Sequence, residues 1–102
     1  MSARRRRLAR HDFPALLAAG KRVSSEHFSV VYTDKVSGYA VVVSKKVAKT
    51  AVRRHLLKRR IRAILEHTDV PNGCAVFARS GADTLSFGAL ETELQTLLAR
   101  IA

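Results

Sequence analysis

The chain has 102 residues, 47% of them hydrophobic, and its 19 Lys and Arg outnumber its 8 Asp and Glu to give a formal net charge of +11. This length and apolar content predict one domain with a small core and argue against global disorder. The charge predicts a polyanionic partner, either a nucleic acid or an anionic membrane. The lone cysteine, Cys74, excludes an internal disulfide and favours a cytoplasmic protein, and no apolar run approaches the ~18 residues of a membrane span.

The N-terminal segment is basic. Residues 1–10 contain five arginines, which predicts a tail that is mobile alone and becomes ordered on an acidic surface. A short helix is expected next, with Asp12 as its N-cap, Pro14 in its first turn and Gly20 as its terminator. We therefore predict a flexible tail over 1–10 and a single folded domain over 11–102.

Strands are predicted where β-branched and aromatic residues gather. The segments 27–33 and 39–44 have this composition, and the polar segment 21–25 precedes them as a possible first strand. The turn sequence DKVSG joins the two stronger segments, so we expect them to form an antiparallel hairpin. Their near-continuous valines indicate that a helix covers at least one face.

A strongly basic segment follows at 45–62, with nine of the 19 Lys and Arg and no acid, Gly or Pro. Its composition predicts a helix from about residue 48. An apolar stripe suited to burial lies on one side, at Leu57, Ile61, Ile64 and Leu65. Two ladders of basic side chains at i, i+4 spacing lie on another side: Arg54, Lys58 and Arg62, with His55 and Arg59 beside them. Because like charges at this spacing repel, a row without Glu partners indicates a polyanion that meets it.

The remaining residues predict a strand and a helix. The loop 68–73 contains two turn signals, and the apolar run 74–79 predicts a strand. An amphipathic helix is expected from about Ser86, with its apolar stripe at Leu90, Leu94, Leu97, Leu98 and Ile101. Five of the eight acids lie after Arg62, so the binding surface is expected in the first two-thirds of the chain. The element order α-β-β-β-α-β-α predicts an α+β fold with helices packed on one small sheet.

Nothing in the sequence predicts a catalytic or metal site on the protein itself. A nuclease that acts alone needs metal-binding carboxylates or an acid–base pair, and the acids here are few and never clustered. The four histidines fall in different predicted elements without the spacing of metal ligands.

Taken together, these motifs resemble the protein subunit of bacterial ribonuclease P, over about 4–98. The resemblance rests on an opening helix, a signature basic helix and a closing strand: Asp12-Phe13 with Gly20; Ser44-Lys45-Lys46, Ala51, Arg54-His55, Lys58-Arg59 and Arg62; and CAVFAR ending at Arg79. It implies a ribosomal-protein-like two-layer sandwich. It also implies a left-handed crossover around the basic helix, against the usual right-handed rule. The chain departs from the family's Arg-Asn-Arg at Arg54-His55-Leu56, where His55 is a polar substitute and Leu56 loses a cation.

The resemblance also implies the function. In this family the RNA subunit is the catalyst and holds the Mg²⁺. The protein assists by binding that RNA and the 5′ leader of precursor tRNA, in the cytoplasm, with no membrane or protein partner required. The expected contacts to the RNA subunit lie in and just before the basic helix: Lys45, Lys46, Lys49, Arg53, Arg54, His55, Lys58, Arg59 and Arg62.

A groove for the single-stranded leader needs cations and aromatic faces. The candidates are Phe13, Leu17, Phe28, Val30 and Tyr32. Strand alternation places the last three on one face, so that face is either all core or all groove. Three alternatives stay open: a small ribosomal protein or other structural RNA-binding protein, a DNA-binding nucleoid protein, and a membrane-surface helix, which would need a large apolar face opposite its charges.

Overall fold

The computed structural model describes residues 7–68 and 73–101. Its helices and strands follow the predicted order and confirm the α+β class. In chain order they are the 3-10 helix η1 (Arg10–Asp12), α1 (Phe13–Ala19), β1 (Lys21–Ser24), β2 (Phe28–Thr33), β3 (Gly38–Val42), α2 (Ala51–Glu66), β4 (Gly73–Ala78), the 3-10 helix η2 (Ala82–Thr84) and α3 (Phe87–Ala99).

The four strands form one mixed sheet in the order β1-β2-β4-β3. The predicted hairpin between 27–33 and 39–44 is wrong, because β4 lies between β2 and β3. Val76 of β4 pairs with Val30 on its antiparallel side and with Val41 on its parallel side. The first four residues of β4 are buried, which suits the central position, where a strand is hydrogen-bonded along both edges and covered on both faces.

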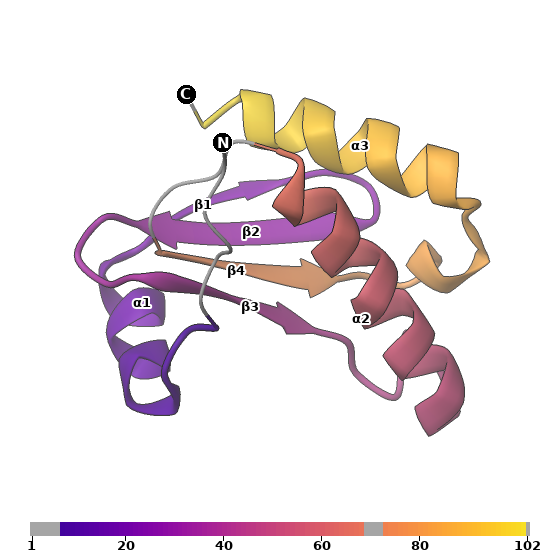
Figure 1. The fold of residues 1–102 in the computed structure, drawn as a ribbon, viewed down its shortest axis with the longest axis horizontal. Coiled ribbons are helices and arrows are strands. Elements are labelled where there is room, and N and C mark those ends of the chain that lie inside the picture. The colour runs from indigo at the N-terminus through magenta and orange to yellow at the C-terminus, as the bar shows by residue number, and fades with distance from the viewer. Residues whose placement is uncertain (1–6, 69–72, 102) are drawn as a thin grey trace.

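The connection from β3 through α2 to β4 is left-handed, as the resemblance implied. In Figure 1 both strands run to the right, β4 lies above β3, and α2 crosses on the side nearer the viewer. Helix α2 thus crosses one face of the sheet, and its N-terminal end extends beyond the ends of β3 and β4 (Figure 1).

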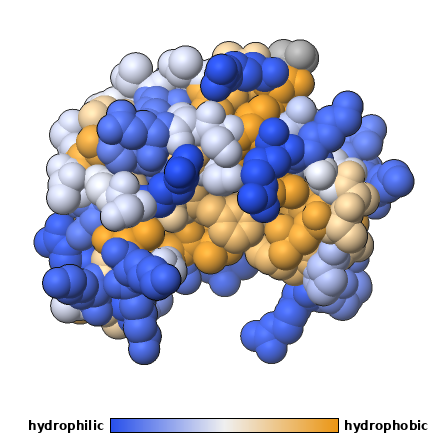
Figure 2. Space-filling view, turned by 180° about the vertical axis from the view of Figure 1, so that it is seen from behind, coloured by the Kyte–Doolittle hydropathy of each residue, from blue (hydrophilic) through white to orange (hydrophobic). Residues whose placement is uncertain are grey.

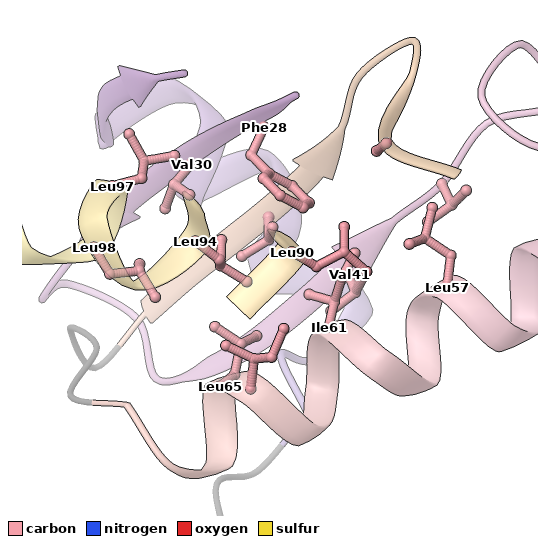
Figure 3. Packing of buried hydrophobic residues seen from close by; sticks show 14 of the residues in the cluster. Phe28, Val30, Val41, Leu57, Ile61, Leu65, Leu90, Leu94, Leu97 and Leu98 are labelled. Carbon is pink, nitrogen blue, oxygen red and sulfur yellow. The ribbon is translucent and has the colours of Figure 1, made fainter. Parts of the chain in front are cut away.

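Helices α2 and α3 cover the same face of the sheet and form the main core (Figure 3). The stripe predicted for α2 is buried at Leu57, Ile61, Ile64 and Leu65, and that of α3 at Leu90, Leu94, Leu97 and Leu98. Both stripes pack on strand residues such as Phe28 and Val30. These two layers, the sheet and the α2–α3 pair, are the predicted sandwich.

The opposite face of the sheet carries α1, a helix of only seven residues. Leu16 of α1 is buried with Val31 and Ala75 in a second, smaller cluster. The rings of Phe13 and Phe77 pack edge to face, with centroids 6.2 Å apart. A helix this short covers part of the face, so side chains farther along the strands keep some exposure.

The predicted boundary of the tail is wrong for residues 7–10. The Leu8 N–H donates to the Tyr39 carbonyl at 2.8 Å, and η1 begins at Arg10, so these residues belong to the folded domain. Residues 1–6 of the predicted tail lie outside the described residues, and so do residues 69–72 of the predicted loop 68–73. Among the helices that are described, none is long and apolar enough to cross a membrane.

Candidate RNA-binding interface

The turn before α2 presents three lysines to solvent. Val47 and Ala48 face inward, and their N–H groups donate to the Ser44 carbonyl at 3.1 and 3.2 Å. This closes a turn whose buried residues hold it against the core. The side chains on either side of them, Lys45 and Lys46 before and Lys49 after, are exposed. Thr50 then caps α2, its side-chain oxygen accepting from the Arg53 N–H at 3.2 Å.

One flank of α2 carries the predicted ladder of Arg54, Lys58 and Arg62, all half-buried. Arg54 donates from Nη1 to the carbonyls of Ala48 and Lys49 at 3.0 and 3.2 Å, so it also fixes the lysine turn. This flank faces the β3 edge, because Arg62 lines a hollow there together with β3 residues. His55 and Arg59, beside the ladder, are exposed. The structure thus brings eight of the nine predicted RNA contacts onto one continuous surface, which we call the basic surface: Lys45, Lys46, Lys49, Arg54, His55, Lys58, Arg59 and Arg62.

Arg53 is the exception. Its Nε lies 2.6 Å from Asp83 Oδ2, and its Nη2 donates to the Asp83 carbonyl at 3.4 Å. The interaction joins the opposite flank of α2 to η2, so the charge of Arg53 is balanced within the protein. Its contact with RNA stays a prediction, made from a flank of α2 that lies away from the other eight residues.

The five residues predicted for the leader groove do not form one groove. Phe28 and Val30 have 0% exposure in the main core, and Tyr32 packs against the same cluster. Phe13 and Leu17 lie on α1, across the sheet. Placing Phe28 and Val30 in the groove is therefore wrong, since α2 and α3 cover them. Tyr32 keeps partial exposure and lines an open hollow with Lys21 and Lys35, so its contact with the leader stays a prediction. Strand alternation correctly placed Phe28, Val30 and Tyr32 on one face of the sheet, and that face packs on the main core.

The α1 face of the sheet holds an exposed strip, and the sequence reasoning missed the strand residues of it. Phe77, Ser29 and Val42 are paired in register across β4, β2 and β3, and all three keep partial exposure. Phe13 of α1 packs on Phe77, and Leu17, on the same helix, is 43% exposed. We call these five residues the α1-side strip. Figure 2 shows this face of the molecule, with apolar surface across its centre and hydrophilic side chains on both sides.

A polar network closes the other end of the sheet. The Glu93 carboxylate accepts from the Ser25 hydroxyl and the His27 backbone N–H, and it lies 2.7 Å from His27 Nδ1. Burial raises the pKa of Glu93, but the hydrogen bonds from Ser25 and His27 lower it by more, so its pKa lies below the ordinary value. The network ties the β1–β2 turn to α3. In the part of the chain that the structure describes, no three His, Cys, Asp or Glu residues gather as metal ligands would.

A small α+β domain whose crossover helix is lined with cations defines a nucleic-acid-binding protein. The family model for Ribonuclease P matches residues 1–102. The chain is 31% identical to the ribonuclease P protein component of Microcystis aeruginosa over 89% of this chain and 85% of that protein. It is 26% identical to that of Legionella pneumophila strain Corby over 95% and 89%.

Solved structures agree. The ribonuclease P protein of Thermotoga maritima superposes with a TM-score of 0.81 at 29% identity, covering 96% of this chain and 99% of that one. The Staphylococcus aureus protein shares the fold, with a TM-score of 0.79 at 23% identity and coverage of 98% and 96%. The chain therefore belongs to the ribonuclease P protein family. Its function is that of the protein component of this tRNA-processing ribonuclease, in partnership with ribonuclease P RNA.

Proposed function

We propose that this chain binds ribonuclease P RNA through its basic surface and the 5′ leader of precursor tRNA through its α1-side strip, while the RNA subunit and its Mg²⁺ carry out the cleavage. The observation that carries the proposal is the basic surface itself. Seven Lys and Arg side chains and His55 lie along one turn and one helix, and the ion pairs of the described residues leave all seven cations unneutralised.

Electrostatics supports RNA as the partner of this surface. Each phosphate that a cation neutralises releases counterions and adds about 0.7–0.9 to the slope of log affinity against log salt. Half-buried Arg54, Lys58 and Arg62 lose little side-chain entropy on binding, because packing already restricts them. Fully exposed side chains with the same charges would lose more side-chain entropy on binding.

The α1-side strip supports contact with a single strand. Base stacking on aromatic side chains contributes about 1–3 kcal/mol per base and tolerates any sequence, as a variable leader requires. Phe77 and Phe13 offer such rings, and Ser29 adds a hydroxyl beside Phe77. The strip replaces Phe28 and Val30, which α2 and α3 cover.

Placement of the chemistry on the RNA subunit agrees with what the protein's acids do. Glu93 accepts hydrogen bonds from Ser25 and His27, and Asp83 pairs with Arg53, so both serve the fold. The Cys74 thiol is buried in β4. We further propose that the protein acts in the cytoplasm, where a thiol stays reduced.

Single-turnover cleavage of a precursor tRNA by a bacterial ribonuclease P RNA at low Mg²⁺, with and without the protein, tests the proposal. We expect a large stimulation by the wild-type chain that is lost when Arg54, Lys58 and Arg62 are all replaced by Gln. Tight RNA binding without stimulation would instead indicate a ribosomal or other structural RNA-binding protein.

A further inference from the structure

An open hollow lies at the end of β1 and β2 opposite the Glu93 network. Its volume is about 430 Å³, within the range of about 300–1,000 Å³ that small-molecule sites occupy. Separate segments line it: the end of α1, the start of β1, the end of β2 with the turn after it, and the residues after α3. The basic surface and the α1-side strip contribute no residue to it.

The fold places an aromatic ring and a cation side by side in this hollow. Tyr32 pairs with Lys21 across β2 and β1, so their side chains lie on the same face of the sheet. Gly20 lets the end of α1 lie close to β2, because a Cβ there would be 2.5 Å from Val31 Cγ1. Ile101, just after α3, packs against the main core on the face of Tyr32. The part of the Tyr32 ring that the core leaves uncovered therefore borders the hollow.

Charges of both signs surround this ring. Lys21, Asp34 and Lys35 line the hollow and are exposed, and the ion pairs of the described residues include none of the three. The turn that carries two of them is held by the Lys35 N–H, which donates to the Thr33 hydroxyl at 3.3 Å. Asp34 would repel a bare anion, and the two lysines would repel a cation. The set suits a ligand that carries both hydrogen-bond donors and an anionic group.

We propose that this hollow binds a free nucleoside monophosphate. A base has the flat face that stacks on the Tyr32 ring, and this contact accepts any base. The ammonium groups of Lys21 and Lys35 meet the phosphate, in charge-assisted hydrogen bonds. The Asp34 carboxylate accepts from the ribose hydroxyls, which a bare phosphate lacks. Each chemical part of a nucleotide thus has a matching side chain in the hollow.

The hollow is separate from the surface proposed for the leader. Tyr32 lies on the face of the sheet that packs on the main core, whereas Ser29 of the α1-side strip lies on the opposite face and nearer the other end of β2. An RNA strand on the strip would have to pass around the sheet to reach Tyr32. A free nucleotide needs no such path. The inference goes beyond the proposed function, and the experiment distinguishes the two sources of nucleotide.

Tyrosine ring resonances give a local readout, because the chain has two tyrosines and the second, Tyr39, is buried. The full chain with labelled tyrosine is titrated with adenosine monophosphate at constant ionic strength. Ribose 5-phosphate and inorganic phosphate are the reference ligands, since both lack a base. We expect adenosine monophosphate to shift the Tyr32 ring resonances, with little shift from either reference ligand and none at Tyr39.

Charge variants test the lysines. The double variant Lys21→Gln, Lys35→Gln should raise the Kd for adenosine monophosphate, measured at Tyr32, by about tenfold. Arg22→Gln is the matched control, because it removes a cation from the next position of β1, whose side chain points to the opposite face, and it should leave the Kd unchanged. Tyr32→Leu keeps an apolar side chain against the core but removes the ring. The shift of the Lys35 N–H, followed in that variant, should be lost.

Each other outcome has a definite meaning. Tyr32 resonances that do not move overturn the site, and so does an equal rise in Kd in Arg22→Gln, which would trace the effect to net charge. Equal shifts with ribose 5-phosphate would mean that no base is bound and overturn the nucleotide assignment. A shift with a single-stranded leader oligonucleotide but not with adenosine monophosphate assigns Tyr32 to the leader and overturns the free ligand. A chain that binds adenosine monophosphate but does not stimulate cleavage contradicts the proposed function and leaves the site standing.

Discussion

The two faces of the sheet use the same residue type in different ways. Phe28 and Phe77 lie on adjacent paired strands, β2 and β4, but their side chains point to opposite faces. Phe28 is fully buried beneath α2 and α3, whereas Phe77 is partly exposed beside α1. The length of the covering helices sets this difference, because α2 and α3 have 16 and 13 residues and α1 has seven. Aromatic composition alone therefore cannot separate core from binding surface.

The largest expected effect is on the covered face. Phe28→Ala should lower the free energy of unfolding by about 3–5 kcal/mol, because it leaves a cavity in the main core. Phe77→Ala is the matched control, and its free energy of unfolding should fall clearly less, since the Phe77 ring is partly exposed. Urea denaturation of both variants measures the difference, and equal losses would mean that the two faces are equally covered.

Glu93 stabilises the β1–β2 turn at the edge of the face that α2 and α3 cover. Glu93→Gln should cost about 1.5–3 kcal/mol at neutral pH, because hydrogen bonds to a charged acceptor are lost. The pKa of Glu93 is lowered in the folded state, so its contribution is present above the ordinary carboxyl pKa of about 4.3 and is lost as the pH falls through the lower folded value. The variant's unfolding free energy should therefore change less with pH in the acidic range. Urea titrations from pH 3 to 7, chosen to span roughly that value, test this. Identical pH profiles for variant and wild type would contradict the role of Glu93.

The α1 face should show the reverse pattern, with small effects on folding and larger effects on binding. Phe77→Ala should weaken affinity for a precursor tRNA with a leader by about 1–3 kcal/mol, the range for one stacked base. Affinity for mature tRNA, which has no leader, is the internal control and should not change. Fluorescence titrations of both RNAs against the holoenzyme measure the effect. Equal weakening for the two RNAs would remove Phe77 from leader binding.

Local periodicity accounts for what could be predicted from the sequence. The buried stripes of α2 and α3 follow from spacing within one helix, and each was correct at every residue in the main core, from Leu57 to Leu65 and from Leu90 to Leu98. Alternation likewise placed Phe28, Val30 and Tyr32 on one face. Strand pairing and the choice of covered face depend on contacts distant in sequence. For that reason we did not predict the position of β4 between β2 and β3, the exposure of Phe77 or the pairing of Arg53 with Asp83.

The smallest expected effect on stability is that of the Arg53–Asp83 ion pair, which distinguishes the two flanks of α2. Asp83→Asn removes the partner of Arg53, and because Arg53 is half-exposed the loss of stability should be only about 0–1 kcal/mol. The freed guanidinium can then meet a phosphate, so affinity for ribonuclease P RNA should hold or rise and the salt slope should steepen. Lys58→Gln on the other flank should do the opposite and lower the slope by about 0.7–0.9. Binding measured across a range of salt concentrations compares the two variants. If Asp83→Asn weakens RNA binding as much as Lys58→Gln, the ion pair orients Arg53 toward the RNA, and the basic surface includes both flanks of the helix.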